Sequence, residues 1–186
     1  YTGSTVDNNV VSGMSPSDYS TWRIGNLGTV IGSTGPPPAP ARVFQWNKDF
    51  LGDWATQSNW NPIDSVNVPL TKANNGNHTV IFPDDAAITG STNVNTAAAV
   101  SVNRIQFEHP THSFVVSGVG SVNLHATTDP NTPVNPSMSA TGTHQFQAVV
   151  NLHADTTIDV NSASTLSMNN AVNLSGVTLT KTGTGT

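Results

Sequence analysis

The sequence predicts an all-β fold, either a short, imperfect β-solenoid or a sandwich of the jelly-roll type, preceded by an extended N-terminal arm. Three observations support this. Only 9% of the 186 residues are charged, far below the ~25% of a typical soluble domain, and Ser, Thr, Asn and Gly replace them. Strand-like runs recur about every ten residues with no helical segment between them. The third observation is a repeated phrase.

The repeated phrase occurs four times in the C-terminal half of the chain, as Val-Asn-Arg in the first copy and as Val-Asn-Leu in the other three. Its copies begin at Val102, Val122, Val150 and Val172, and the second and third extend to Val-Asn-Leu-His-Ala. Starts about 20 to 28 residues apart are typical of successive turns of a β-solenoid or strands of a repetitive sheet. Because the spacing is uneven, and because residues 127–143 are rich in Pro, Asn and Ser and are expected to form a surface loop, we predict a short stack.

Composition divides the chain into an arm (residues 1–35), a Pro-rich spacer (36–42) and a β-rich body (43–186). The spacer is expected to be stiff, as polyproline segments are. The arm either packs on its own body or is held away, so that a strand of it adds to the sheet of a neighbouring subunit. The second arrangement predicts a homo-oligomer or homopolymer. The apolar residues of the arm that would mediate it are Val10, Val11, Trp22, Ile24, Leu27, Val30 and Ile31.

Nine strand-like runs are predicted within the body after its Trp-rich opening. Each alternates apolar and polar residues or is a short apolar run, and Gly, Pro, Asn or Asp separates it from the next. The runs are residues 79–82, 98–102, 104–107, 113–116, 121–126, 145–153, 156–160, 171–174 and 177–180.

Charge and composition exclude several classes of protein. The net charge is −5 and the six Lys and Arg residues are scattered singly, which argues against a nucleic-acid partner. No apolar run approaches the ~20 residues of a membrane helix. The absence of Cys excludes disulfides and, with the low charge, fits an exported bacterial protein at the cell surface or outside the cell. Because the sequence opens at Tyr1 without a signal peptide, we expect a processed chain or a fragment.

Three Trp residues near the start of the body are the candidate binding residues. Exposed, Trp46, Trp54 and Trp60 would form a flat platform for a polysaccharide or glycan. Buried, they would supply the large apolar surface that a body so rich in Ser and Thr otherwise lacks. We expect them in the core and keep sugar binding as the alternative.

Acidic pairs offer little catalytic chemistry. Asp155 and Asp159 lie four residues apart on a predicted strand, which separates their Cα atoms by ~13 Å, whereas glycosidase carboxylates lie ~5 to 9.5 Å apart. We expect both on a solvated face. Asp84 and Asp85 follow a proline and could help bind Ca²⁺, but an ordinary turn is the simpler interpretation.

Histidines are the other candidates for chemistry. His109 and His112 flank an expected turn, where two imidazoles could bind a metal, but no third or fourth ligand is evident. His125 and His153 occupy equivalent places in the repeated phrase and are expected to stack or pair across the repeats. No nucleophile–base set or phosphate-binding loop can be assembled. The sequence therefore predicts neither an enzyme nor a cofactor nor a metal site.

Two segments carry a resemblance to a known family. The opening, with Phe44-Gln45-Trp46, Gly52-Asp53-Trp54 and Ser58-Asn59-Trp60-Asn61-Pro62, resembles the first module of bacterial autotransporter-like passenger proteins. The closing residues 174–186 resemble the autotransporter-associated β-strand repeat, in which Leu-Thr-Lys-x-Gly-x-Gly-Thr leads into another strand. The resemblance covers about residues 43–186. It implies a secreted, right-handed, solenoid-like surface protein without fixed catalytic residues.

The sequence departs from this family in two respects. It stops where the family's next strand would begin, and it contains no outer-membrane translocator. The family also does not explain the arm. We therefore expect, first, an extracellular subunit of a filament or fibre, assembled by adding the arm to a neighbour. The alternatives are an N-terminal fragment of an autotransporter-like adhesin and a carbohydrate-binding module.

Overall fold

A computed structural model describes residues 41–62, 76–127 and 133–186, and the statements below concern these residues. The chain divides into two units, Tyr1–Pro38 and Ala39–Thr186, and only the second contains described residues. The predicted arm, including its seven apolar residues, lies outside them, as does most of the spacer. The described part is all-β, as the sequence predicts, with a single 3₁₀ turn at Gln57–Asn59 as its only helical element.

The described strands form three sheets. The first, sheet A, contains β1 (Val43–Trp46), β3 (Trp60–Pro62), β4 (Thr79–Phe82), β7 (Arg104–Phe107), β10 (Ser137–Ala140), β13 (Thr156–Val160) and β16 (Leu179–Thr182). Sheet B contains β2 (Leu51–Asp53), β5 (Thr92–Asn95), β8 (Phe114–Ser117), β11 (Thr143–Phe146) and β14 (Thr165–Met168). Sheet C contains β6 (Val100–Val102), β9 (Ser121–Leu124), β12 (Val149–Leu152) and β15 (Val172–Leu174).

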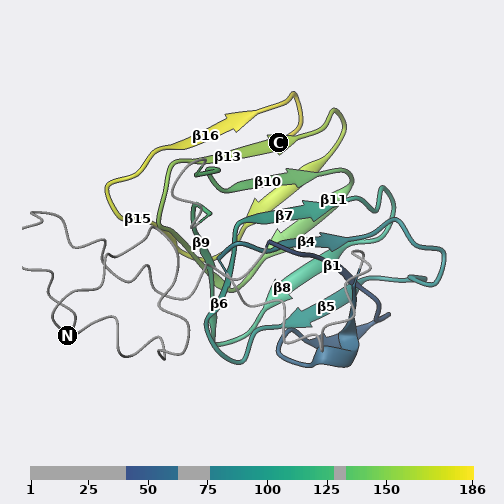
Figure 1. Cartoon of the computed structure of the whole chain (residues 1–186). Helices are drawn as coiled ribbons and strands as arrows, with labels where there is room; N and C mark the ends of the chain where they lie inside the picture. Colours follow the sequence, from purple (N-terminus) through teal and green to yellow (C-terminus); the bar gives the residue numbers. More distant parts are fainter. Residues whose placement is uncertain (1–40, 63–75, 128–132) are drawn as a thin grey trace, which may run out of the picture. The chain divides into compact units, whose positions relative to one another are not determined.

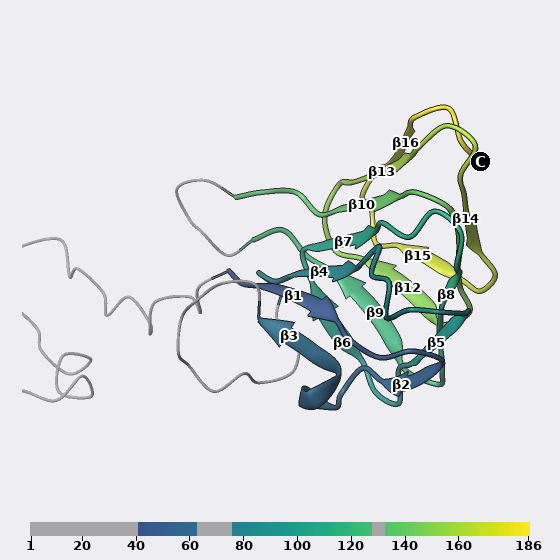
Figure 2. The same ribbon diagram turned by 90° about the vertical axis from the view of Figure 1, so that its right-hand side faces the viewer.

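Successive strands of the chain belong to different sheets, and the chain winds around a common core. From β4 onward each strand pairs in parallel with the strand three places further along, so that β4–β6, β7–β9, β10–β12 and β13–β15 are successive rungs. Figure 1 shows β4, β7, β10, β13 and β16 stacked in this order, and Figure 2 shows sheet C turned into view. Of the two architectures left open by the sequence, the molecule is the β-solenoid, a parallel one with three faces.

Alternation of side chains builds the core. Most strands bury every second residue, as expected where one face of a sheet is covered. Because the strands pair without stagger, inward residues stack in columns, one of which runs through Phe44, Val80, Ile105, Met138 and Ile158. The three sheets therefore enclose one continuous apolar core.

Three of the four repeated phrases lie in register, and the first does not. Val122, Val150 and Val172 pair with one another on sheet C. The prediction of a fourth equivalent copy is wrong, because Val100 rather than Val102 pairs with Val122. Asn103 instead lies between β6 and β7, where its Nδ2 donates to the carbonyl oxygens of His125 and Val134 at 2.8 and 2.9 Å.

Two predicted segments are also corrected. Residues 145–153, predicted as one run, contain the end of β11 and all of β12, with a corner between them. Residues 127–143, predicted as a surface loop, contain β10 and the start of β11. Strand β10 has the sequence Ser-Met-Ser-Ala, and its inward residues Met138 and Ala140 are buried. Because the residues of β10 are small or polar, the sequence pattern does not reveal this strand, although the stack requires it.

Candidate functional site

The N-terminal end of the solenoid is closed by tryptophan. Trp46, Trp54 and Trp60 are all buried, and the ring centroids of Trp46 and Trp54 lie 4.9 and 5.1 Å from that of Trp60. The indole of Trp60 donates to the carbonyl oxygen of Trp54 at 2.9 Å, and that of Trp46 to the carbonyl oxygen of Lys48 at 2.7 Å. Strand β3 pairs antiparallel with β1 beside this cluster, which we call the tryptophan cap.

Burial places the three tryptophans in the core, the role expected of them, and leaves no ring face for a sugar. The nearest surface feature is a shallow, open hollow lined by Thr56, Gln57, Ser58 and Trp60. Only 4% of Trp60 is exposed, so this hollow has no aromatic platform.

The C-terminal end is different, because apolar residues of its last strands are uncovered. Leu174 of β15 pairs with Leu152 of β12 in the same inward column, yet Leu174 is 50% exposed and Leu152 is 0% exposed. Leu179 of β16 lies over the buried Thr156 and is 36% exposed. Among the described residues, β15 pairs only with β12 and β16 only with β13. We call β15 and β16, with Leu174 and Leu179, the open end.

Sheet B is already extended by a few residues at this end. Gly185 donates its N–H to the carbonyl oxygen of Val160 at 3.0 Å, and Thr186 exchanges backbone hydrogen bonds with Ser164 and Leu166 at 3.0 and 2.8 Å. Among the described residues, the edges of β15 and β16 thus remain the available ones at this end of the solenoid.

The outer face of sheet C carries a ladder of amides, which the sequence analysis missed. Asn151 donates its Nδ2 hydrogen to Oδ1 of Asn123 at 2.7 Å, and Asn173 donates to Oδ1 of Asn151 at 2.8 Å. Asn123 donates to the carbonyl oxygen of Val100 at 3.1 Å. The repetition of Val-Asn-Leu was the available signal. It marks the outward Asn as clearly as the inward Val and Leu.

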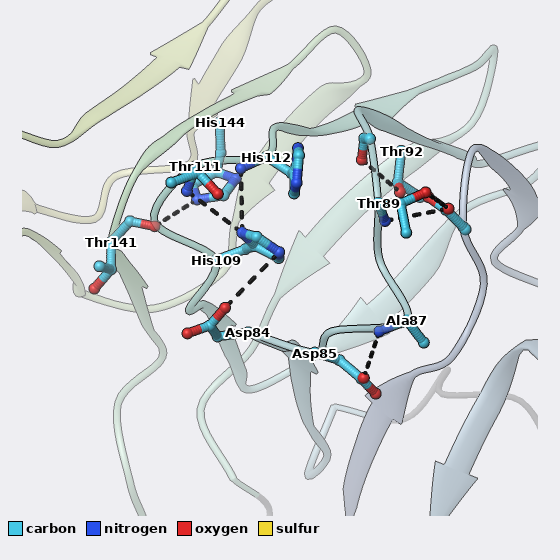
Figure 3. A network of polar contacts seen from close by, with 12 residues as sticks. Asp84, Asp85, Ala87, Thr89, Thr92, His109, Thr111, His112, Thr141 and His144 are labelled. Carbon is cyan, nitrogen blue, oxygen red and sulfur yellow. Dashed lines mark hydrogen bonds and ion pairs between the residues drawn. The ribbon is translucent and has the colours of Figure 1, made fainter.

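The expected turn histidines lie in a polar network beside sheet B (Figure 3). His109 Nδ1 accepts the backbone N–H groups of Thr111 and His112 at 3.4 and 3.1 Å, and its Nε2 lies 3.8 Å from Asp84. Both acceptor contacts tie Nδ1 of His109 to the backbone of its own turn. Among the described residues no group of three or more His, Asp or Glu side chains could hold a metal ion.

His144 is a buried member of the same region that the sequence analysis did not single out. Its Nδ1 accepts the N–H of Phe114 at 3.1 Å, while its Nε2 donates to the carbonyl oxygen of Thr141 at 2.7 Å. The ring stacks on Phe107 with centroids 4.8 Å apart. Burial lowers the pKa of His144, so this side chain is a neutral part of the core.

The acidic pairs serve the backbone and neighbouring rungs. Asp85 accepts the N–H of Ala87 at 2.9 Å, and Figure 3 shows it directed away from Asp84. Asp155, which precedes β13, accepts the N–H of Thr178 at 2.8 Å, and Asp159 accepts the hydroxyl of Thr182 at 2.9 Å. Asp155 and Asp159 therefore each hold the next rung, whereas Asp85 holds its own turn.

Comparisons with protein-family models, with curated proteins and with solved structures found no match. Within the described residues no helix has the length and apolar character needed to cross a membrane. The geometry thus defines a parallel β-solenoid with one closed end and one open end, and the open end is the candidate functional site.

Proposed function

We propose that this protein is an extracellular structural subunit, which assembles into a filament when the arm of one copy adds as a strand to the open end of the next. The observation that carries the proposal is the exposure of Leu174 and Leu179 beside the edges of β15 and β16. Apolar area removed from water contributes ~25 cal/mol per Å², and an unpaired edge supplies backbone hydrogen-bond groups for another strand.

The difference between the two ends supports a contact that propagates. The tryptophan cap closes one end of the core, whereas the other end is uncovered. A contact between unlike surfaces is heterologous, and such contacts produce open chains of subunits unless the rotation closes a ring. The apolar residues of the arm and the stiff spacer supply a second surface with the required character.

The expected location outside the cell or at its surface belongs to the same proposal. The outward positions of the sheets carry mostly Ser, Thr, Asn and Gln, and the chain contains no Cys. Neutral polar residues form hydrogen bonds without depending on charge, so such a surface tolerates the variable ionic conditions met outside a cell.

Removal of residues 1–35 tests the proposal. We expect the full chain to form filaments in electron micrographs and the shortened chain to elute as a monomer in size-exclusion chromatography with light scattering. Leu174→Ser should weaken assembly of the full chain. Val119→Ser is the matched control, because Val119 is 96% exposed at the corner between β8 and β9, away from the open end. Normal filaments from the shortened chain would contradict the proposal.

A second candidate is an autotransporter-like surface adhesin of which these residues form the N-terminal piece. One observation favours it: Thr186 already pairs through its backbone with Ser164 and Leu166 beside β14 of sheet B, as a continuing solenoid would. Mass spectrometry of the intact natural polypeptide discriminates between the two, because a mass far above 19.4 kDa favours the adhesin.

A further inference from the structure

We propose that the amide ladder on sheet C selects the incoming strand and its register, and that this strand is Gly25-Asn26-Leu27 from the arm of a second copy. The inference rests on the proposed function, which supplies the open end and the arm. The inference adds which residue the open end of one copy and the arm of the other contribute to their contact.

The ladder has a direction that its first contact fixes. A carbonyl oxygen can only accept, so Asn123 must present Nδ2 to the carbonyl oxygen of Val100. Its Oδ1 then points toward the next rung and accepts from Asn151, whose Oδ1 accepts from Asn173 in turn. Every amide therefore donates toward the tryptophan cap and accepts from the open end.

Asn173 ends this series with its Oδ1 directed at the added strand. Its Nδ2 is used by Asn151, and among the described residues no donor reaches its Oδ1. A hydrogen-bond donor placed opposite Asn173 would therefore continue the series. Asn at this position reproduces the contact already made twice, whereas Asp, which only accepts when ionised, would place two acceptors against each other.

The residues on either side of that donor must suit the core. Val172 and Leu174 flank Asn173 and face inward, as their partners Val150 and Leu152 do. The added strand must therefore carry non-polar residues on both sides of its donor. A shift of one residue would turn the amide into the core and the apolar residues to water.

The arm contains three asparagines, and one of them meets these conditions. Asn8 lies between Asp7 and Asn9, and Asn9 follows Asn8, so both have a polar neighbour. Asn26 lies between Gly25 and Leu27. In register with β15, Leu27 would cover Leu174 and Gly25 would lie over Val172.

The outward neighbours agree with this register. Two residues before Asn26 is Ile24, which would lie beside Ala171, two residues before Asn173 on the outward face. Two residues after it is Gly28, which adds no side chain to crowd the neighbouring column. Pairing of Gly25-Asn26-Leu27 with β15 thus satisfies both faces of the strand.

Crosslinking between two single-cysteine variants of the full chain tests the pairing. The chain has no Cys of its own, so Asn26→Cys in one copy and Asn173→Cys in another give no background. Partners across adjacent strands fall within the ~4.4 to 6.8 Å Cα separation that a disulfide requires. We expect a mixed disulfide between the two copies on oxidation. Asn9→Cys mixed with Asn173→Cys is the matched control and should give none.

The donor requirement is tested by the assembly of full-length variants at neutral pH. Asn26→Asp should raise the protein concentration needed for filaments, measured by sedimentation, about 10-fold or more. A 10-fold change corresponds to the free energy expected for the loss of one hydrogen bond that leaves an acceptor unpaired. Asn26→Gln retains the donor and should change the concentration needed for filaments little. Asn9→Asp introduces the same charge in the arm and should behave as the unaltered chain.

Three results would overturn the inference. Filaments that form without the mixed disulfide would leave the proposed function standing and remove this pairing. A disulfide formed only within a chain carrying both Asn26→Cys and Asn173→Cys would make its own arm the occupant. Equal effects of Asn26→Asp and Asn9→Asp would remove the role of the ladder. Failure of the proposed function has a different signature, since filaments would then be absent or would not require residues 1–35.

Discussion

The imidazole rings of His125 and His153 lie parallel, with centroids 4.2 Å apart and an interplanar angle of 4°. The stacking predicted for this pair is confirmed. Each ring follows the inward Leu of a repeated phrase, so the stack is the neighbour of the amide ladder on sheet C. Desolvation by partial burial, and then the charge of His153, lower the pKa of His125. Neutral rings suit this stack, whereas two imidazolium rings would repel one another.

Stability should therefore fall as the solution is acidified below the pKa of an unfolded His, ~6.5. Between that value and the lowered pKa in the folded state, the unfolded chain binds more protons, so the free energy of unfolding decreases with decreasing pH. Thermal unfolding followed from about pH 7.5 to pH 5 measures the slope. His125→Gln should reduce the slope, although part of it should persist because the pKa of His144 is lowered as well. An unchanged slope would contradict this role for the stack.

The amide ladder should contribute measurably to the stability of one copy. Asn151→Ala removes the bond to Asn123 and the bond from Asn173, and we expect a loss of about 1 to 2 kcal/mol, because a net hydrogen bond contributes ~0.5 to 1.5 kcal/mol. Urea denaturation measures this loss. Asn170→Ala is the control, since the exposed side chain of Asn170 also makes two hydrogen bonds, to the carbonyl oxygen of Gln147 and from the N–H of Ala171, but lies outside the ladder. A smaller effect at Asn151 than at Asn170 would exclude cooperation along the ladder.

The tryptophan cap should be the most sensitive part of the core. Trp54→Ala is expected to lower the free energy of unfolding by about 3 to 5 kcal/mol, the range for loss of a large buried aromatic. Trp54→Phe, which retains much of the volume, should cost less. Phe50→Ala is the exposed control, because Phe50 is 64% exposed. Denaturation monitored by circular dichroism provides the comparison, and a small loss for Trp54→Ala would show that the cap is not part of the cooperative core.

Gly142 and Gly176 both have a left-handed backbone, and replacing each by Ala distinguishes the cost of backbone strain from that of a steric clash. Gly142 has φ +98°, and a Cβ there would collide with the carbonyl oxygen of His109. Gly176 has φ +75° with no atom within 4 Å of the added Cβ. Gly176→Ala should therefore cost only the ~1 to 2 kcal/mol of the left-handed backbone, and Gly142→Ala distinctly more. Paired melting curves of the two variants test this, and equal losses would refute the role of the collision.

Sequence alone predicted most of the strands whose inward residues are large and apolar, although it missed β14 with Leu166 and Met168. Strand β4 (Thr-Val-Ile-Phe) and strand β7 (Arg-Ile-Gln-Phe) alternate strongly, and their positions agree with the prediction. Strand β5 (Thr-Asn-Val-Asn) was missed, because only Val94 marks it and its other inward residue is Thr92. Its place on the rung depends on pairing with β2 and β8, which a local pattern does not contain.

The exposure of Leu174 could not be predicted for a related reason. Leu152 and Leu174 end identical Val-Asn-Leu phrases, but one is fully buried and the other half exposed. Leu152 and Leu174 differ in the position of their rungs in the stack, and this position is known only once the strands have been assigned to rungs. The alternation of apolar and polar residues could not distinguish a solenoid from a sandwich either, since strands have the same period of two in both.

The tryptophan cap also has a consequence for the order in which the chain folds. Each rung contacts only its neighbours, so a rung forms most easily on a surface that already exists. The cap joins residues close in sequence, such as Trp54 and Trp60, and closing so short a loop has a small entropic cost. We therefore expect a nucleus at residues 43–62 and growth toward Thr186, the same direction in which the chain is synthesised.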